Sequence, residues 1–320
     1  MSRTYWLSYG AGVNSTALAI LLCEGKLPQY RPFKLIFSDT GNEKDETYAY
    51  LHEHAIPYFQ RHGVEYIGVR PELTVLEYWQ SYSMVGSRVV RVCTDKAKIK
   101  PIEAYVERHA AAEDAQLIGY HAAESHRARQ HPLDKRPKLF PLVDLGIDND
   151  GCKDIITAAG LPIPPKSGCW HCPFMRVGEI RDLFWKHPER FAAIARLEAI
   201  SLERHPLPPP TVEEVLEECS QCNGGGVLAD GLYPGACQFC GGGGRVKSGE
   251  RIKPSPKRAQ WGDTPVAEWV ERFKREAAQG TLLDLPQDRQ YDEIPCGCFD
   301  GDDDEPRPAS MADAPKEAKP

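Results

Sequence analysis

A short glycine-containing segment near the N-terminus constrains the fold of this 320-residue chain more than any other feature. Residues 5–8 are an apolar run typical of a buried strand, and residues 15–22 have the composition of a helix. Between these two, Gly10 and Gly12 let the backbone turn sharply and come close to an anion. The first N–H groups of the helix and its partial positive charge would then face that anion. The segment therefore predicts a phosphate site between the first strand and the first helix.

Strands and helices are expected to alternate along the first part of the chain. The expected strands are 5–8, 33–38, 65–69 and 115–119, and the expected helices are 15–22, 45–61 and 98–112. This alternation predicts an α/β fold, a doubly wound parallel sheet with crossover helices. Ligands of such sheets bind at the carboxyl ends of the strands, where the chemically informative segments of this chain also lie.

The phosphate segment resembles the PP-loop (Ser-Gly-Gly-x-Asp-Ser) of the adenine nucleotide α-hydrolase superfamily, a HUP-type fold. Gly10–Ser15 occupies the loop, with Gly10 at the usual first serine and Asn14 at the usual aspartate. The Lys-Ser/Thr ending of a Walker A loop and the Gly-x-Gly-x-x-Gly spacing are both absent from this segment. The resemblance implies that a nucleotide is bound by Ser8, Gly10, Gly12, Asn14, Ser15 and Thr16.

Three later segments resemble those of phosphoadenosine phosphosulfate (PAPS) reductases within the same superfamily. They are Ser38-Asp39-Thr40-Gly41, Arg91-Val92-Cys93-Thr94 with Lys98-Ile99-Lys100-Pro101, and the stretch 119–129. The resemblance implies that Asp39 meets ribose or Mg²⁺ and that Thr40 hydrogen-bonds adenosine. It adds Gly119 and Glu124 to the nucleotide site, and it implies that the catalytic residues are Asp39, Lys98, Arg127 and Arg129.

Four cysteines predict a metal site near the same sheet edge. Cys169 and Cys172 form a two-residue-spaced pair, Cys152 lies upstream, and Cys93 belongs to the Arg-Val-Cys-Thr segment. Four thiolates on loops fit a tetrahedral zinc ion or an iron–sulfur cluster, and the spacing alone does not choose between them. In cluster-containing sulfonucleotide reductases and in reductase-like enzymes of DNA phosphorothioation, equivalent cysteines hold a 4Fe-4S cluster. The resemblance therefore favours that cofactor, with zinc or free redox cysteines as alternatives.

A second set of cysteines predicts a structural zinc ribbon. Its members are Cys219, Cys222, Cys237 and Cys240, and each pair is followed by glycines. Glycine allows the tight knuckle that directs two thiolates at one ion. The two segments resemble the Cys-x-x-Cys-x-Gly-x-Gly repeats of J-domain cochaperones. A module this short buries little apolar surface, so the metal would supply its folding energy.

Composition completes the expected domain organisation. We expect a nucleotide-binding domain over 1–205, a proline-rich linker and zinc ribbon over 206–250, a helical extension over 251–290, and an acidic disordered tail over 291–320. Nine acidic and three basic residues lie in that tail, so most of the net charge of −7 belongs to it. No signal-peptide pattern or membrane-length apolar run is present, and eleven cysteines are typical of metal or redox chemistry, so we expect a cytoplasmic protein.

Three functions are compatible with these patterns. The leading hypothesis is an enzyme that cleaves ATP at the α-phosphate, with Mg²⁺, and adenylates an acceptor that then receives sulfur; the expected partners are tRNA or DNA and a sulfur donor. The second is reduction of PAPS or adenylylsulfate, with Cys296 or Cys298 as nucleophile and a thioredoxin-like reductant. The third is a nucleotide- or nucleic-acid-binding adaptor whose catalytic loop has decayed, because Val13 and Asn14 depart from the usual loop residues.

Overall fold

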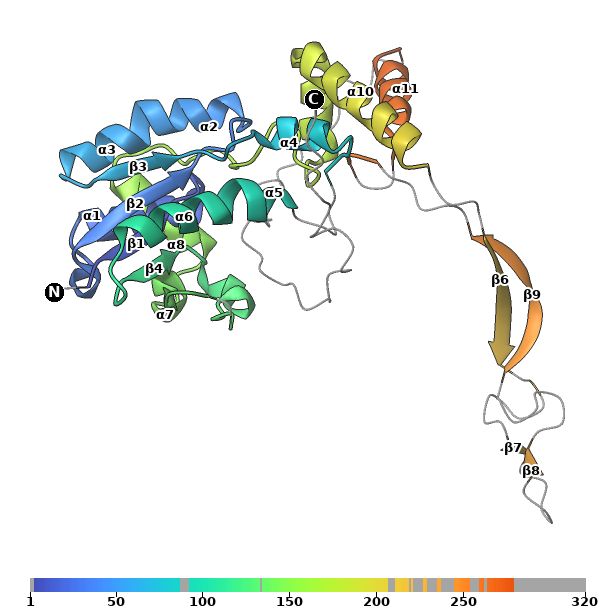
Figure 1. Cartoon of the computed structure of the whole chain (residues 1–320), viewed down its shortest axis with the longest axis horizontal. Helices are drawn as coiled ribbons and strands as arrows, with labels where there is room; N and C mark the ends of the chain where they lie inside the picture. The colour runs from blue at the N-terminus through green and yellow to red at the C-terminus, as the bar shows by residue number, and fades with distance from the viewer. Residues whose placement is uncertain are drawn as a thin grey trace, which may run out of the picture.

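A parallel five-stranded sheet forms the centre of the protein in this computed structural model (Figure 1). The structure describes residues 3–86, 92–132, 134–206, 211–218, 220, 227–228, 235–236, 245–253, 259–261 and 264–278. The strands are β1 (Tyr5–Ser8), β2 (Phe33–Ser38), β3 (Tyr66–Val69), β4 (Ala115–Ile118) and β5 (Lys138–Leu139). Their order in the sheet is β3-β2-β1-β4-β5, and every neighbouring pair is parallel. In this register Ser8, at the end of β1, lies beside Ile36 and Ile118, so the central strands end together.

Helices follow most of the strands. Those of the first 205 residues are α1 (Val13–Cys23), η1 (Pro28–Tyr30), α2 (Asp45–Tyr50), η2 (Leu51–Ala55), α3 (Ile56–Arg61), α4 (Val75–Ser81), α5 (Val92–Thr94), η3 (Asp95–Ile99), α6 (Lys100–His109), η4 (Ala122–Arg127), α7 (Pro141–Asp144), α8 (Asn149–Ala158), α9 (Val177–Lys186) and α10 (Pro188–Arg204). α2, η2 and α3 continue one another as a single helical stretch over 45–61, which confirms the helix expected there. Single π-helical turns, η2 and η3, interrupt this stretch and the one that leads into α6.

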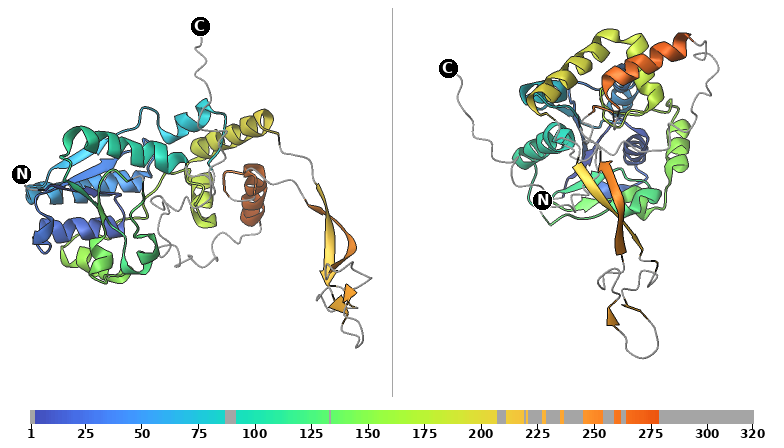
Figure 2. Two further views of the ribbon diagram at one scale, coloured as in Figure 1. Left: turned by 60° about the horizontal axis from the view of Figure 1, so that its bottom comes forward. Right: turned by 90° about the vertical axis from the view of Figure 1, so that its right-hand side faces the viewer.

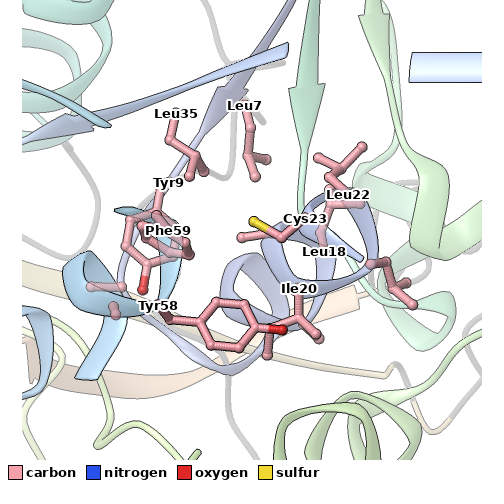
Figure 3. Close-up of a cluster of buried hydrophobic side chains, with 14 of the residues drawn as sticks. Leu7, Tyr9, Leu18, Ile20, Leu22, Cys23, Leu35, Tyr58 and Phe59 are labelled. Carbon is pink, nitrogen blue, oxygen red and sulfur yellow. The ribbon is translucent and has the colours of Figure 1, made fainter. Parts of the chain in front are cut away.

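The alternation of strand side chains explains why both faces of the sheet are covered. Leu7 and Leu35 are fully buried in the larger core with residues of α1, α3 and α8 (Figure 3). Trp6 and Ile36 point to the opposite face, where they pack with Ile102 and its neighbours on α6. Successive residues of a strand face opposite sides, so this double burial requires helices on both faces. The predicted α/β, doubly wound architecture is confirmed.

The last described helix packs on the body of the protein. α11 (Val266–Ala278) contributes Trp269 and Phe273 to a cluster shared with Ile180 of α9 and Phe191 of α10. Before it, β6 (Thr211–Glu218) and β9 (Arg245–Lys253) pair antiparallel and extend away from the α/β body (Figure 2). β7 (Val227–Leu228) and β8 (Gly235–Ala236) form a second short pair. In the described part of the chain, helices fall short of the length and apolar character that crossing a membrane requires.

Some predictions concern residues outside the described part of the chain. These are the four zinc-ribbon cysteines, Cys219, Cys222, Cys237 and Cys240, the tail cysteines Cys296 and Cys298, and the acidic tail over 291–320. The zinc ribbon and the disordered tail therefore stay predictions.

Candidate functional site

The predicted phosphate loop connects β1 to α1 in a strained turn. Ala11 takes a left-handed backbone conformation with φ of 56°, although it is not a glycine, and it is fully buried. Such strain persists only where the surrounding structure holds it, and it is common at functional sites. α1 begins after Gly12 without any side-chain hydrogen bond to its first turn. The N–H groups of that turn therefore remain available to an anion.

A cavity of about 360 Å³ opens at this loop. Nine of the predicted site residues line it, namely Ser8, Gly10, Gly12, Asn14, Ser15, Lys98, Gly119, Glu124 and Arg127. They come from the ends of β1 and β4, the start of α1, and the helical turns η3 and η4. The sheet therefore gathers three sequence-distant segments around one hollow, as expected for the carboxyl edge of parallel strands.

Four predicted site residues are not among those that line the cavity. The Thr16 hydroxyl lies 3.1 Å from the hydroxyl of Tyr9 in the core, so its predicted role as a phosphate donor does not fit this geometry. Thr40 instead donates to the carboxylate of Glu43, at 3.1 Å. Arg129 donates through Nε to the carbonyl of His126 at 2.7 Å.

Asp39 is the fourth of these residues, and it belongs to a network beside the cavity. Its carboxylate accepts from the Tyr48 hydroxyl at 2.6 Å, the Arg70 Nε at 2.8 Å and the Gly41 N–H at 2.9 Å. Burial opposes ionisation of this carboxyl, but the three hydrogen bonds outweigh burial and lower its pKa. Asp39 is therefore an ionised group whose acceptors are already engaged, and its predicted contact with ribose or Mg²⁺ would require some of these bonds to exchange.

Asn14 and Glu124 form a pair that explains the unusual asparagine in the loop. The Asn14 amide donates to Glu124 Oε2 at 2.9 Å, and Arg127 binds the other oxygen of the same carboxylate. Glu124 is 4% exposed, and Arg127 also stacks over the ring of Tyr120 at 4.4 Å. An aspartate at position 14 would place a second carboxylate against Glu124, with the like-charge repulsion that this entails. Asparagine therefore suits this position because the neighbouring strand end supplies the negative charge.

Gly119 permits the close contact between β4 and the phosphate loop. A Cβ atom at this position would lie 2.9 Å from the Cα of Ser15 and 3.0 Å from its backbone nitrogen. Both of these atoms belong to the backbone at the start of α1, so they cannot turn aside as a flexible side chain would. Only glycine lets the end of β4 approach this turn so closely.

Lys98 joins the cavity to the cysteines. It is 8% exposed, it lines the cavity, and its ammonium lies 3.4 Å from Glu43 Oε1. Burial opposes its charge, but the nearby carboxylate of Glu43 outweighs burial and raises the Lys98 pKa. Lys98 is therefore a buried, charged side chain that Glu43 holds at the edge of the cavity.

Three of the four predicted metal cysteines gather near Lys98. Cys93 and Cys169 pack in one cluster with Trp79, and Cys172 interacts electrostatically with Cys93, Cys169 and Lys98. Cys152 instead lies on α8, fully buried in the large core beside α1. The structure thus does not bring the predicted fourth ligand to the other three, because α8 uses this small residue for packing.

Burial keeps the three clustered thiols protonated in the structure as it stands. It raises the pKa of Cys172 to about 11, that of Cys169 well above its usual range, and that of Cys93 less strongly. The Cys169 Sγ also lies 3.4 Å from the Thr40 hydroxyl. Such thiols would become ligands only by losing their protons to an incoming metal, which is the usual coupling of metal binding to deprotonation.

The donors near these thiols suit a metal centre in chemical type. Glu43 is 2% exposed and His171 fully buried, yet Glu43 Oε2 and both ring nitrogens of His171 make no hydrogen bond to the described residues. Buried polar atoms of this kind are rare unless a water, ion or ligand satisfies them. In their present positions, however, the described His, Cys, Asp and Glu side chains form no group of three or more arranged to hold a metal ion. Cys93, Cys169 and Cys172 fit such a group by chemistry, and Cys152 lies apart from them in the large core.

Several residues of this site had no role in the sequence-based prediction. Asn149, Lys153, Lys166 and Ser167 line the cavity, and Glu43 lies beside Lys98. Glu43 follows directly in the Asp-Thr-Gly segment, so its position after a strand end was a usable signal. The other four lie on α8 and on the irregular stretch after it, where no motif marks them.

Comparisons with known proteins find similarity in the part of the chain that carries the loop. Residues 4–145 match the phosphoadenosine phosphosulfate reductase domain family. A search of the curated proteins finds no match. Among solved structures, the chain is similar to the U34-tRNA thiolase NcsA from Methanococcus maripaludis with its 4Fe-4S cluster, at 15% identity and a TM-score of 0.34, over 63% of this chain and 73% of that one.

The matched residues carry the parts of the site that define the family resemblance. They include the loop between β1 and α1, the Asp-Thr-Gly segment after β2, Lys98, and the turn that holds Glu124. Cys169 and Cys172 lie beyond them. The similarity to the phosphoadenosine phosphosulfate reductase domain family therefore covers residues 4–145, a little under half of the 320-residue chain.

Proposed function

We propose that the protein is a PP-loop enzyme that binds an adenine nucleotide, cleaves ATP at the α-phosphate, and couples this adenylation to sulfur transfer onto a nucleic acid. One observation carries the proposal: Lys98 lines the phosphate cavity and also lies 3.4 Å from Glu43, which pairs through its backbone with Cys169. A reactive sulfur at this cysteine would therefore lie next to a nucleotide whose phosphates are at the loop.

The residues of the cavity suit a polyanionic ligand. Four Lys and Arg side chains line it, namely Lys98, Arg127, Lys153 and Lys166, against one carboxylate, that of Glu124. The loop N–H groups would hold the phosphates, and the cations would stabilise charge that develops as the leaving group departs. An oxygen of the acceptor would form a bond to the α-phosphorus while the bond to pyrophosphate breaks. A hydrosulfide-equivalent donor would then form the carbon–sulfur bond as AMP leaves with that oxygen, without net electron transfer.

Cys93, Cys169 and Cys172 would hold the iron–sulfur cluster or zinc ion that the resemblance implies. When bound, this group would supply a site for the sulfur that is delivered. The protein's own residues would keep the three thiols beside Lys98 and exclude water from them. The burial of Lys98 and Glu43 supports this role.

The second candidate is PAPS reduction, which the family match of residues 4–145 favours. One experiment separates the two reactions. Anaerobically purified protein is incubated with Mg·ATP, sulfide and bulk tRNA, or with PAPS and a dithiol, while pyrophosphate and sulfite are measured. We expect pyrophosphate release from ATP that depends on tRNA. Sulfite release from PAPS without pyrophosphate release from ATP would overturn the proposal.

A variant pair ties the reaction to the shared cation. Lys98→Met removes the buried ammonium, whereas Lys96→Met removes an exposed one from the same helical turn. Loss of charge stabilisation at a reacting group commonly lowers the rate by about 10²–10³-fold. We expect that loss of pyrophosphate release for Lys98→Met only; equal rates in the two variants would remove Lys98 from the mechanism.

A further inference from the structure

A glutamine far along the chain is buried among the cysteine-bearing segments. Gln260 is completely buried, although glutamine is mostly an exposed residue in proteins. Its side-chain oxygen accepts from the Gly86 N–H at 2.9 Å, and its side-chain nitrogen donates to the His171 carbonyl at 2.5 Å. Its backbone N–H donates to Glu198 at 2.9 Å. A buried amide with both ends bonded fixes the relative position of the groups it joins.

The two groups that Gln260 joins belong to different cysteine segments. Gly86 follows Met84 and Val85, which pack with Cys93 and Trp79 in one cluster, and it lies so close to the Trp79 ring that a Cβ there would be 2.4 Å from it. His171 lies between Cys169 and Cys172 in the chain. Gln260 therefore links the segment that precedes Cys93 to the loop of the other two thiols.

The next residue extends the same contact. The indole N–H of Trp261 donates to the Cys172 carbonyl at 3.1 Å, and its ring is 2% exposed against Phe191 of α10. Glu198, also on α10, accepts from the N–H groups of Gln260 and Val266 at 2.9 and 2.7 Å. The short segment 259–261 thus contacts α10 through Glu198 and Phe191, and it contacts the loop that carries Cys169 and Cys172 through the Trp261 side chain.

The other side of that loop is held by the Asp-Thr-Gly segment. The Trp170 N–H donates to the Asn42 carbonyl and the Lys44 N–H to the Gly168 carbonyl, both at 3.0 Å. Gly168 has φ of 149°, in the region that favours glycine, directly before Cys169. Cys169 and Cys172 therefore lie on a turn that is clamped from the nucleotide-binding domain on one side and from residues 260–261 on the other.

We infer that Gln260 and Trp261 are positioning residues of the cysteine site: they hold Cys93, Cys169 and Cys172 together beside Lys98. The site is incomplete within residues 4–145 and within the first 205 residues, because its last contacts come from the segment that follows β9. The inference concerns the arrangement of the thiols and holds for either nucleotide reaction.

Residue-resolved alkylation tests this inference on the full chain. Anaerobic protein is treated briefly with iodoacetamide, and modification of each cysteine is read by peptide mass spectrometry. The variants are Gln260→Met, which keeps the side-chain length but loses both side-chain hydrogen bonds, and Trp261→Phe, which keeps an aromatic ring but loses the bond to Cys172 and part of the ring volume. Gln80→Met, at an exposed position of α4, is the matched control. Cys23 and Cys152, buried in the large core, are internal references.

The expected result is selective exposure. Gln260→Met should raise alkylation of Cys93, Cys169 and Cys172 by about tenfold or more, because each lost buried hydrogen bond shifts a local opening equilibrium several-fold and this variant loses two. Trp261→Phe should raise the alkylation of Cys172 most, and Gln80→Met should leave the alkylation of every cysteine unchanged. Equal increases at Cys23 and Cys152 would show general destabilisation and overturn the inference, as would an unchanged pattern in Gln260→Met. The measurement needs no turnover, so its outcome is separate from that of the proposed reaction.

Discussion

Replacement of Gly119 by alanine is the sharpest test of the phosphate loop geometry. The added Cβ would lie 2.9 Å from Ser15 Cα and 3.2 Å from the Asn14 carbonyl carbon, whereas ordinary contacts of this kind begin at 3.4 Å. Relief of the closest contact therefore requires a movement of about half an ångström at the start of α1. Overpacking of this type costs about 1–3 kcal/mol. The same movement displaces the N–H groups that would bind phosphate.

Two measurements follow from this displacement. Thermal unfolding should show a Tm lower by about 2–12 °C, since about 1 kcal/mol corresponds to about 2–4 °C in a domain of this size. Calorimetric titration with Mg·ATP and with PAPS should show binding of the preferred nucleotide weakened by about tenfold or more, because each 1.4 kcal/mol of lost binding free energy is tenfold in affinity.

A second alanine variant in the same sheet provides the control. A Cβ added to Gly68 of β3 would meet only the Tyr66 ring, at 4.0 Å, so Gly68→Ala should leave nucleotide affinity unchanged. Wild-type affinity and Tm in Gly119→Ala would refute the argument that β4 and the loop touch through backbone atoms. Equal weakening in both variants would show that the effect is not local to the cavity.

Three further predictions concern charge and thiols. Asn14→Asp should weaken nucleotide binding about tenfold through repulsion from Glu124, and Asn14→Asp combined with Glu124→Gln should recover most of it; calorimetry that finds no coupling would contradict the pair. Cys152→Ala should retain the iron bound by anaerobically reconstituted protein, whereas Cys169→Ser should lose it, as measured by metal analysis; the reverse order would restore the four-cysteine set. Glu179 should stabilise the protein above about pH 4.3 and lose that contribution as pH falls through its lower folded-state value, because burial opposes its ionisation but Lys44 and other donors outweigh burial and lower its pKa. The unfolding free energies of wild type and Glu179→Gln should therefore differ by about 1–3 kcal/mol at pH 7 and converge as the pH falls below the folded-state pKa of Glu179. A difference that stays constant with pH would refute this assignment.

The secondary structure was predictable because it depends on short stretches of chain. The apolar run at 33–38 is a strand, and the helical pattern at 45–61 is a helix, at nearly the expected bounds. A turn between β1 and α1 was equally predictable, although its left-handed residue is Ala11 and not Gly10 or Gly12. The expectation of a parallel sheet followed from the same local periodicities.

The roles of single side chains were less predictable where a neighbour already engages them. Thr16 has the right place in the motif, yet its hydroxyl meets Tyr9 in the core. Asp39 follows its strand as expected, but Tyr48 and Arg70 occupy its acceptors. A side chain can have two chemically suitable partners, and the packing of the fold determines which of them it contacts. A sequence motif contains no information about that packing.

The amino-acid sequence by itself determined the order of strands and helices, the glycine turn, and the supply of cations and thiols for one edge of the sheet. Only the tertiary structure decided that Cys152 belongs to the core, that Lys98 lines the cavity, and that Gln260 bonds to the backbone of the loop that carries Cys169 and Cys172. The physical reason is range. Backbone conformation follows from residues a few positions apart. These three contacts instead join segments that are far apart in the chain, and such contacts depend on the packing of the whole fold.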